Sequence, residues 1–303
     1  MKVPRHLKEH IGKAAGLVEA LPYMQRFRGQ VFLIKVGGAS MEDPDLVEGL
    51  LRDVVFLEAV GINPVLVHGG GKAISRAMAD EGLEPRFVGG MRVTDEAAIS
   101  LVDRVLTGMI NPSLVIGIEN FGGAAQRGSG KEVFIGEKAP GETPEGEKID
   151  LGYVGRVADV RIDAIEDAIA REVVPVVTPL AAERRTGDTL NVNADVAAAA
   201  LAGRLKAQKI IFLSDVLGVM RNPERPSSLI SSIADDEIEP LIEQQLISGG
   251  MIPKVRSAID ALDAGVGKVH LIDGRIPHSL LLEIFTDLGI GTEIYARAGA
   301  ARG

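Results

Sequence analysis

The sequence contains no cysteine and no tryptophan among its 303 residues. Without cysteine the chain has no disulfides, no thiolate metal ligands and no cysteine nucleophile, which fits the reducing cytoplasm, where we expect the protein to function. Aromatic residues are few, with 8 Phe and 3 Tyr, whereas glycine is abundant, with 36 residues. So many glycines indicate frequent tight turns between strands and helices, where the backbone approaches another group closely.

The chain also lacks an excess of basic residues and long apolar runs. Its 33 Lys and Arg against 42 Asp and Glu give a formal charge of -9. Such a charge repels phosphate backbones and anionic lipids, which argues against nucleic-acid and membrane-surface proteins, although a local basic pocket is compatible with it. No run of about 18 uncharged apolar residues occurs, and the first 30 residues carry repeated charges. We therefore expect neither a membrane anchor nor a signal peptide.

The remaining composition is typical of a globular protein. Hydrophobic residues make up 46% of the chain and charged residues 25%, with a mean hydropathy of +0.17. These values exclude a disordered or fibrous chain. At roughly 150 residues per domain, the length leaves room for two lobes or for one large sheet with an elaborated edge.

Continuous apolar runs predict buried strands, with helical periodicity between them. The runs span residues 31–36, 64–69, 171–180, 209–216 and 268–273. Continuous apolar strands are covered on both faces, which is typical of a mainly parallel sheet between helices. The sequence thus predicts an α/β fold, a three-layer sandwich with a central, mainly parallel sheet. Helical patterns lie at 44–60, 72–81, 94–106, 194–205, 236–247, 254–264 and 277–288.

Two further segments differ from this alternation. Residues 5–24 carry apolar side chains at helical spacing, which predicts an amphipathic helix that ends near Pro22 and Gly29. This helix precedes the first strand and is therefore an appendage to the sheet. Residues 121–150 mix glycine, proline and charge, which predicts a hairpin with an exposed tip.

Glycines follow the first two predicted strands. The first strand ends in Lys35–Gly38, a lysine followed by Val-Gly-Gly, and the second ends in His68–Gly71, a histidine followed by three glycines. Parallel sheets bind ligands at the carboxyl ends of their strands, and glycines before a helix present free N–H groups to an anion. Alone, these motifs are equally compatible with an exposed lysine beside a turn, a tight turn, and a hydrogen-bonded histidine at a strand end.

Polar residues also precede two predicted helices. Arg92 stands before a helix whose N-cap we expect at Thr94, where the guanidinium group can bind a carboxylate; the alternative is a surface ion pair. Asn191, Asn193 and Asp195 lie at the start of an alanine-rich helix. One cap needs only one such side chain, so the excess suggests a ligand site, with capping and solvation as the alternative.

The last two motifs lie in the C-terminal third of the chain. Ser214–Val219 ends a strand, and Gly249–Lys254 precedes a helix in which Pro253 suits the first turn. A lysine again lies beside glycines. We therefore expect Lys35 and Lys254 at ligand-facing edges of the sheet, although they are far apart in the sequence.

Together, these six ordered motifs resemble the amino acid kinase family, and within it the members that phosphorylate N-acetyl-L-glutamate. The resemblance covers almost the whole chain and implies an eight-stranded sheet, with a helical arm at 1–29, an acyl-substrate lobe at 30–206 and an ATP lobe at 207–303. It implies transfer of the γ-phosphoryl group of ATP to the side-chain carboxylate of N-acetyl-L-glutamate, in arginine biosynthesis. Mg²⁺ is implied as an ion held mainly by the nucleotide phosphates, without a carboxylate cage.

The resemblance also assigns roles to residues. It implies that Lys35 and Lys254 stabilise charge on the transferring phosphoryl group and that Asp195 holds both ammonium groups in place. The acceptor carboxylate is already ionised, so the reaction needs no general base, and positioned cations offset the repulsion between two anions. The other implied contacts are to the acyl substrate, through Gly70, Gly71, Arg92 and Asn191, and to the nucleotide, through Gly38, Ser214, Asp215, Gly218 and Gly250.

The helical arm and the C-terminal region resemble arginine-inhibited, hexameric members of the family. In those proteins the arms interlace between dimers, so the resemblance implies a homo-oligomer, namely a hexamer built as a trimer of dimers. Counterparts of Tyr23, His270, Glu283 and Gly289 line or adjoin the effector site there, which implies feedback inhibition by arginine. The alternative is that these four residues only pack the second lobe.

Two other functions are open at this point. One is a catalytically silent, amino-acid-sensing module of the same fold, although such modules commonly lack the lysine pair that is present here. The other is a related kinase that acts on aspartate, glutamate or a carrier-bound aminoadipate. Arg92 together with Asn191 favours an N-acylated α-amino acid over these acceptors.

Overall fold

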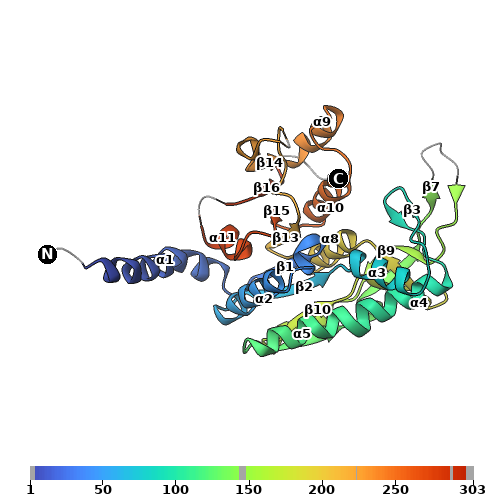
Figure 1. Cartoon of the computed structure of the whole chain (residues 1–303), viewed down its shortest axis with the longest axis horizontal. Coiled ribbons are helices and arrows are strands. Elements are labelled where there is room, and N and C mark those ends of the chain that lie inside the picture. Colours follow the sequence, from blue (N-terminus) through green and yellow to red (C-terminus); the bar gives the residue numbers. More distant parts are fainter. Residues whose placement is uncertain (1–3, 143–147, 223, 287–288, 298–303) are drawn as a thin grey trace.

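A central eight-stranded sheet organises the protein in the computed structural model, which describes residues 4–142, 148–222, 224–286 and 289–297. The strand order is β14-β16-β15-β13-β1-β2-β10-β5 (Figure 1). All neighbouring strands are parallel except β15 and β16. This confirms the predicted mainly parallel sheet. The strands are β1 Val31–Val36, β2 Asn63–His68, β5 Ala125–Gly128, β10 Val174–Val177, β13 Lys209–Ser214, β14 Ser232–Ala234, β15 Lys268–Asp273 and β16 Thr292–Tyr295.

Helices cover both faces of the sheet. Alternate residues of a strand point to opposite faces. Accordingly, Phe32 and Ile34 pack with helices α2, α5 and α11, whereas Leu33 belongs to the core shared with α7, α8 and α10. The three predicted layers are therefore present. The helices named here are α2 Pro44–Ala59, α5 Asn111–Asn120, α7 Asp163–Ala170, α8 Ala194–Arg204, α10 Met251–Asp263 and α11 Ser279–Phe285.

Most predicted elements appear, with shorter bounds. The apolar run at 171–180 forms a strand only at Val174–Val177, and the helical pattern at 236–247 gives only α9, Ile238–Glu243. The remaining helices that we expected are α3, Gly71–Asp80, and α4, Glu96–Val105. Short elements complete the chain: η1 Gly38–Met41, α6 Gly130–Val133, η3 Pro226–Ser228 and η4 Asp235–Glu237.

The helix expected at 94–106 continues further than predicted. A π-helical turn, η2 at Leu106–Ile110, joins α4 to α5, and Pro112 lies in the first turn of α5. The run Glu96–Asn120 is, among the described residues, the one helix long and apolar enough to cross a membrane by length and composition. Its side chains Leu101 and Ile118 are buried in the protein core, as in a helix that packs against other elements.

A small closed barrel, which the sequence did not predict, is formed by strands between residues 134 and 192. Its strands run in the order β11-β12-β9-β6. Beside it, β7 and β8 form an antiparallel hairpin within the segment where we expected one; its tip, 143–147, lies outside the described residues. A second hairpin joins β3 and β4. These strands are β3 Phe87–Val88, β4 Met91–Arg92, β6 Phe134–Lys138, β7 Gly141–Glu142, β8 Lys148–Ile149, β9 Val154–Val160, β11 Leu180–Glu183 and β12 Thr189–Val192.

The N-terminal helix α1, Arg5–Phe27, projects from the body of the molecule (Figure 1). The prediction that it ends near Pro22 is wrong, because the helix runs through this residue and stops before Gly29. An exposed helix tolerates the proline because the carbonyl left without its N–H donor can be solvated. The apolar side chains of the predicted stripe are 43–69% exposed in the single chain, namely Leu7, Ile11, Val18 and Leu21.

Candidate active site

The centre of the sheet contains a topological switch point. Strand β1 has β2 on one side and β13 on the other. In open α/β sheets, ligands bind at the carboxyl ends of the strands beside such a point. Lys35 lies at this end of β1, and the three glycines 69–71 follow β2, with the N–H of Gly69 donating to the carbonyl of Val36 at 2.7 Å.

Two lysines and one aspartate meet at this edge. Nζ of Lys35 lies 2.8 Å from Oδ1 of Asp195, and Nζ of Lys254 lies 2.8 Å from Oδ2 of the same carboxylate. Asp195 is in the first turn of α8 and Lys254 in the first turn of α10. The structure therefore brings together the three residues expected to act on the transferring group. When all three are ionised, the cluster has one net positive charge.

Burial and ion pairing shift the pKa values of Lys35 and Asp195 in opposite directions. Burial lowers the pKa of Lys35 because the ammonium group loses hydration, and Asp195 only partly offsets this effect. For Asp195, burial by itself favours the neutral acid, but Lys35 and Lys254 hold its pKa below the usual value. The carboxylate is therefore ionised at neutral pH and aligns the two lysines.

Gly37 is needed for the position of the Lys35 ammonium group. A Cβ atom at residue 37 would lie 2.6 Å from Nζ of Lys35, which is closer than real contacts of a Cβ atom. The side chain of Lys35 thus occupies the space that any other residue at 37 would fill. The Lys-Val-Gly-Gly motif owes its first glycine to this contact.

A cavity of about 380 Å³ lies beside the cluster. Asn191 reaches it from β12, and its Nδ2 donates to Oγ1 of Thr94 at 3.3 Å. Asn193 instead caps α8, since its Oδ1 accepts from the N–H groups of Asp195 and Val196. Asn193 therefore caps the helix, and both Asn191 and Asn193 line the cavity. Site residues predicted from the sequence that line this cavity are Lys35, Gly38, Gly70, Gly71, Arg92, Asn191 and Asp195.

Arg92 is buried at the border of the same cavity. Its Nη2 donates to the carbonyl of Gly71 at 3.0 Å and to Oγ of Ser75 at 2.8 Å, and its guanidinium group lies 4.7 Å from the ring centre of Phe87. The expected N-cap of the following helix was wrong. Asp95 caps α4, whereas the Thr94 hydroxyl donates to the carbonyl of Arg92. That hydrogen bond holds the backbone of Arg92 directly.

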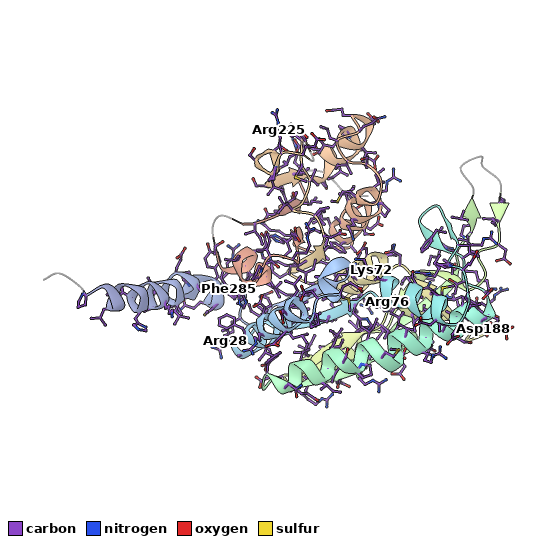
Figure 2. The ribbon with its side chains drawn as sticks, viewed as in Figure 1. Arg28, Lys72, Arg76, Asp188, Arg225 and Phe285 are labelled. Atoms are coloured by element: carbon purple, nitrogen blue, oxygen red, sulfur yellow. The ribbon has the colours of Figure 1, made fainter. Side chains whose placement is uncertain are left out.

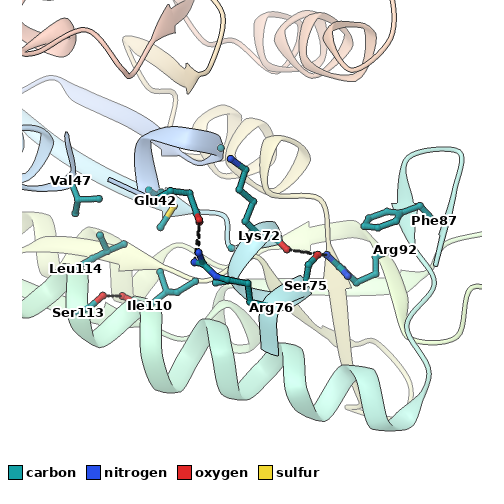
Figure 3. A pocket seen from close by; sticks show the side chains of 15 residues that line it. Glu42, Val47, Lys72, Ser75, Arg76, Phe87, Arg92, Ile110, Ser113 and Leu114 are labelled. Atoms are coloured by element: carbon teal, nitrogen blue, oxygen red, sulfur yellow. Dashed lines mark hydrogen bonds and ion pairs between the residues drawn. The ribbon is translucent and has the colours of Figure 1, made fainter. Parts of the chain in front are cut away.

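A wider cavity of about 770 Å³ adjoins the first and shares Gly70 and Arg92 with it (Figure 3). An ion pair between Arg76 and Glu42, at 2.7 Å, crosses it. Lys72 is exposed on the same lining and has no ion-pair partner among the described residues. Figure 2 places Lys72 and Arg76 near the middle of the molecule. Because Glu42 offsets the charge of Arg76, the net positive charge of this lining comes from Lys72 and Arg92.

Of the residues expected to bind the nucleotide, Gly38 lines both cavities, whereas Ser214, Asp215, Gly218 and Gly250 line neither. The hydroxyl of Ser214 donates to the carbonyls of Val216 and Ile272, so it holds the ends of β13 and β15 together. Gly218 packs closely on Thr292. Asp215 and Gly250 are exposed. The structure thus gives Ser214 and Gly218 packing contacts, and their role toward ATP stays a prediction.

The four residues expected at an effector site share one cavity. Tyr23, His270, Glu283 and Gly289 line a space of about 350 Å³ between the end of α1 and the edge of the sheet. Nδ1 of His270 lies 2.6 Å from Oε1 of Glu283. Glu283 also accepts from the N–H of Ile290 at 2.7 Å. Tyr23 and His270 therefore line one cavity although they are 247 positions apart in the chain.

Lys209 belongs to this cavity and was missed by the sequence analysis. Its Nζ lies 3.0 Å from Nε2 of His270 and 5.3 Å from the ring centre of Phe27. Burial lowers the pKa of Lys209 to about 8. A lysine at the start of an apolar strand is common, so the sequence contains no specific signal for this position.

The described residues contain no group of three or more His, Asp or Glu side chains that could hold a metal ion. Both oxygens of Asp195 are already engaged by lysines. This donor set fits a Mg²⁺ ion that arrives with a nucleotide and keeps its phosphate and water ligands.

Comparison with known proteins agrees with this geometry. Residues 30–273 match the Amino acid kinase family. The acetylglutamate kinase of Akkermansia muciniphila is 54% identical over 284 residues, which cover 94% of this chain and 96% of the relative. That of Aquifex aeolicus is 44% identical over 95% of this chain and 99% of the relative.

Among solved structures, the chain is similar to N-acetylglutamate synthase from Neisseria gonorrhoeae, determined with coenzyme A and N-acetyl-glutamate. The TM-score is 0.82 and the identity 26%, over 94% of this chain. The chain spans only 64% of that synthase. The match over residues 30–273 and the nearly full-length kinase relatives show that this chain belongs to the amino acid kinase family.

Proposed function

We propose that this chain phosphorylates the side-chain carboxylate of N-acetyl-L-glutamate with ATP, in arginine biosynthesis. The product is N-acetyl-L-glutamyl 5-phosphate, a mixed anhydride of a carboxylic and a phosphoric acid. The observation that carries the proposal is the Lys35–Asp195–Lys254 cluster beside the 380 Å³ cavity. It is supported by relatives named acetylglutamate kinase that match almost the full length of the chain.

Arg92 and Asn191 bind the acyl substrate in this proposal. The guanidinium group of Arg92 uses one nitrogen for Gly71 and Ser75, and it has further N–H donors for the α-carboxylate. Asn191 offers its side-chain amide to the acetamido group. The two contacts orient the substrate so that its other carboxylate faces the lysine cluster.

The reaction is then an in-line transfer that needs no proton donor or acceptor. A carboxylate oxygen of the substrate forms a bond to the γ-phosphorus, while the bond from that phosphorus to the bridging oxygen breaks and ADP leaves with the electron pair. Lys35 and Lys254 stabilise the charge on the transferring group, and Asp195 positions both lysines. Backbone N–H groups of Gly38, Gly70 and Gly71 donate to the same oxygens or to the substrate.

The nucleotide binds to the C-terminal third of the chain in this proposal. Residues 30–206 form the acyl-substrate lobe and 207–303 the ATP lobe, with Ser214, Asp215, Gly218 and Gly250 near the nucleotide. A Mg²⁺ ion bound with the nucleotide would supply positive charge next to the phosphates, while Lys35 and Lys254 act on the transferring group from the protein side. The central sheet is continuous across the two lobes, because β1 is hydrogen-bonded to β13.

The cavity at the end of α1 is proposed as the site of feedback inhibition by arginine. Lys209 offers a cation for an α-carboxylate, and Glu283 and Glu293 offer carboxylates for a guanidinium group; all three line the cavity. Tyr23 adds an aromatic face.

The exposed stripe of α1 supports a homo-oligomer in which arms of different subunits pack together, as in a hexamer formed by three dimers. We place this enzyme in the cytoplasm.

A coupled assay of ADP release tests the proposed reaction. Purified protein is supplied with MgATP and, in turn, N-acetyl-L-glutamate, glutamate, aspartate and N-acetylaspartate. We expect turnover with N-acetyl-L-glutamate to exceed that with each other acid. Preference for a free amino acid would contradict the assigned substrate, while leaving phosphoryl transfer in place.

A silent amino-acid-sensing module is the second candidate. The same fold also forms part of a longer synthase chain, solved with coenzyme A and N-acetyl-glutamate, so the fold occurs in proteins that are not named kinases. The two functions are separated by one comparison. A sensing module binds arginine, as measured by calorimetry, yet releases no ADP with any of the four acids.

A further inference from the structure

A buried hydrogen-bonded pair, His68 and Asn111, lies next to the glycine loop, residues 69–71. Their exposed fractions are 0% and 1%. Nδ1 of His68 lies 2.9 Å from the carbonyl oxygen of Gly69. Because a carbonyl oxygen only accepts, Nδ1 carries the proton and Nε2 has a free lone pair. Nε2 accepts from Nδ2 of Asn111 at 3.3 Å.

Asn111 is held through its amide nitrogen. The other N–H of Nδ2 donates to the carbonyl of Val176 in β10 at 2.7 Å. The Oδ1 atom is buried and has no hydrogen-bond partner in the part of the chain that the structure describes. A single nitrogen atom therefore links the end of β2 to β10. Burial lowers the pKa of His68 to about 4, so the ring is a neutral acceptor at physiological pH.

The π-helical turn η2 directs Asn111 toward this histidine. The N–H of Asn111 donates to the carbonyl of Leu106, five residues earlier. In a regular α-helix, at about 100° per residue, the two side chains would point about 140° apart. The longer π turn brings residues five apart onto one face of the helix.

The same turn also packs directly on Gly70. A Cβ atom at residue 70 would lie 2.6 Å from Cδ2 of Leu106 and 2.8 Å from Cδ1 of Ile110. The turn therefore contacts the glycine loop twice, through these apolar side chains and through the bond from Asn111 to His68. Neither His68 nor Asn111 lines the 380 Å³ cavity, so both act on it only through the loop.

We propose that η2 and the Asn111–His68 hydrogen bond form a clamp that fixes the glycine loop for phosphoryl transfer. His68 and Asn111 are positioning residues in this arrangement. The proposal rests on the kinase function above, in which N–H groups of Gly70 and Gly71 point at the reacting anion. Small displacements of such donors slow a reaction strongly, because its rate depends on their alignment.

Asn111→Asp tests the clamp with almost no change of shape. The substitution replaces Nδ2 by an oxygen, which cannot donate to Val176 or to neutral His68 unless a proton binds to the imidazole or to the new carboxyl group. We expect kcat to fall at least about tenfold at pH 9. The ratio of variant to unaltered kcat should rise as the pH is lowered to about 6, where the extra proton binds.

A control in the same strand is Asn63→Asp. Asn63 begins β2, and its Nδ2 donates to the carbonyl of Gly29 at 3.0 Å, at the end of the strand opposite the loop. Its kcat ratio should stay near one at every pH.

A second pair of variants tests His68 as the hydrogen-bond acceptor. His68→Gln retains an acceptor for Asn111 and should keep kcat within about threefold, whereas His68→Leu should lose about tenfold or more.

Thermal unfolding of each variant separates the clamp from simple packing. A lower melting temperature with a ratio of variant to unaltered kcat that stays near one at every pH for Asn111→Asp overturns the proposal. If that variant does not fold, equal kcat values for His68→Gln and His68→Leu overturn it instead. An unaltered protein that prefers another acid contradicts the proposed substrate, and the same kcat ratios are then measured with that acid. An unaltered protein without phosphotransfer overturns both proposals.

Discussion

Nζ of Lys254 lies 2.8 Å from Oδ2 of Asp195, and this ion pair joins α10 to α8 across 59 positions of the sequence. The pair is mostly buried, with side-chain exposures of 19% and 10%. Removing Lys254 leaves Asp195 paired with Lys35, whereas removing Asp195 leaves two ammonium groups without their counter-charge, a change that typically costs about 3–5 kcal/mol for a buried pair. The pair therefore serves stability and, in the proposed reaction, the alignment of both lysines.

Removing either lysine should affect turnover more than binding. Lys35→Ala and Lys254→Ala are expected to lower kcat by about a hundredfold or more, roughly 3 kcal/mol, because both charges act on the transition state. Steady-state kinetics with MgATP and N-acetyl-L-glutamate measure this. Arg256→Ala is the control on α10, since Arg256 makes only an exposed ion pair with Glu239. Near-normal kcat in either lysine variant would contradict the two-lysine mechanism.

Gly37→Ala should impair catalysis while the fold persists. The new methyl group would displace Nζ of Lys35, which lies 2.6 Å from its ideal position. We expect kcat to fall about tenfold or more, with a melting temperature within a few degrees of the unaltered protein. Gly49→Ala in α2 has no atom within 4 Å of the added group and serves as the control. Equal kcat values for both variants would show that Lys35 tolerates displacement.

The pH profile of kcat should report the lowered pKa of Lys35. Burial is the main cause of that lowering, and Asp195 raises the pKa in part. Lys35 loses its proton as the pH rises through this pKa, so kcat should fall at a pH below the ordinary 10.5 of lysine. Asp195→Asn removes the carboxylate that raises the pKa of Lys35, so kcat of this variant should fall at a lower pH. Profiles from pH 6 to 10.5 that coincide for the two proteins would refute this assignment.

Arg92→Ala should mainly weaken binding of the acyl substrate. The guanidinium group is proposed to contact a carboxylate that does not react, so KM for N-acetyl-L-glutamate should rise more than kcat falls. Arg92→Lys should restore little of this binding. An ammonium group lacks the planar guanidinium geometry that can donate to Gly71, to Ser75 and to the substrate at the same time. An unchanged KM with a lower kcat would instead place Arg92 in the chemical step.

Deleting residues 1–26 tests the role of α1. This helix exposes its apolar stripe in the single chain, and a lone helix of this kind gains stability by burying such a stripe. The truncated protein should be an active dimer instead of a hexamer, with weaker inhibition by arginine because Tyr23 is lost from the effector cavity. Light scattering and initial rates across an arginine titration measure both effects. An intact protein that is dimeric and indifferent to millimolar arginine would overturn the regulatory proposal.

The sequence by itself determined the α/β class, five of the eight strands of the central sheet and the glycine and lysine motifs at strand ends. Continuous apolar strands and glycines beside lysines are local patterns, so they can be read without the fold. A ligand-binding role within Asn191–Asp195 could also be predicted, because one helix start does not need three capping groups. The structure then showed that Asn193 caps the helix and that both Asn191 and Asn193 line the cavity.

Only the tertiary structure decided which distant residues meet. Lys254 reaches Asp195 because α10 packs against α8, and Lys209 joins His270 because β13 and β15 are neighbouring parallel strands. The same holds for Asn111. Its direction depends on a π turn, whose hydrogen bonds form where Leu106 and Ile110 pack on Gly70. Pro112 interrupts the helical pattern in the sequence, but packing against the core lets the helix continue through that turn, and no local pattern reveals this.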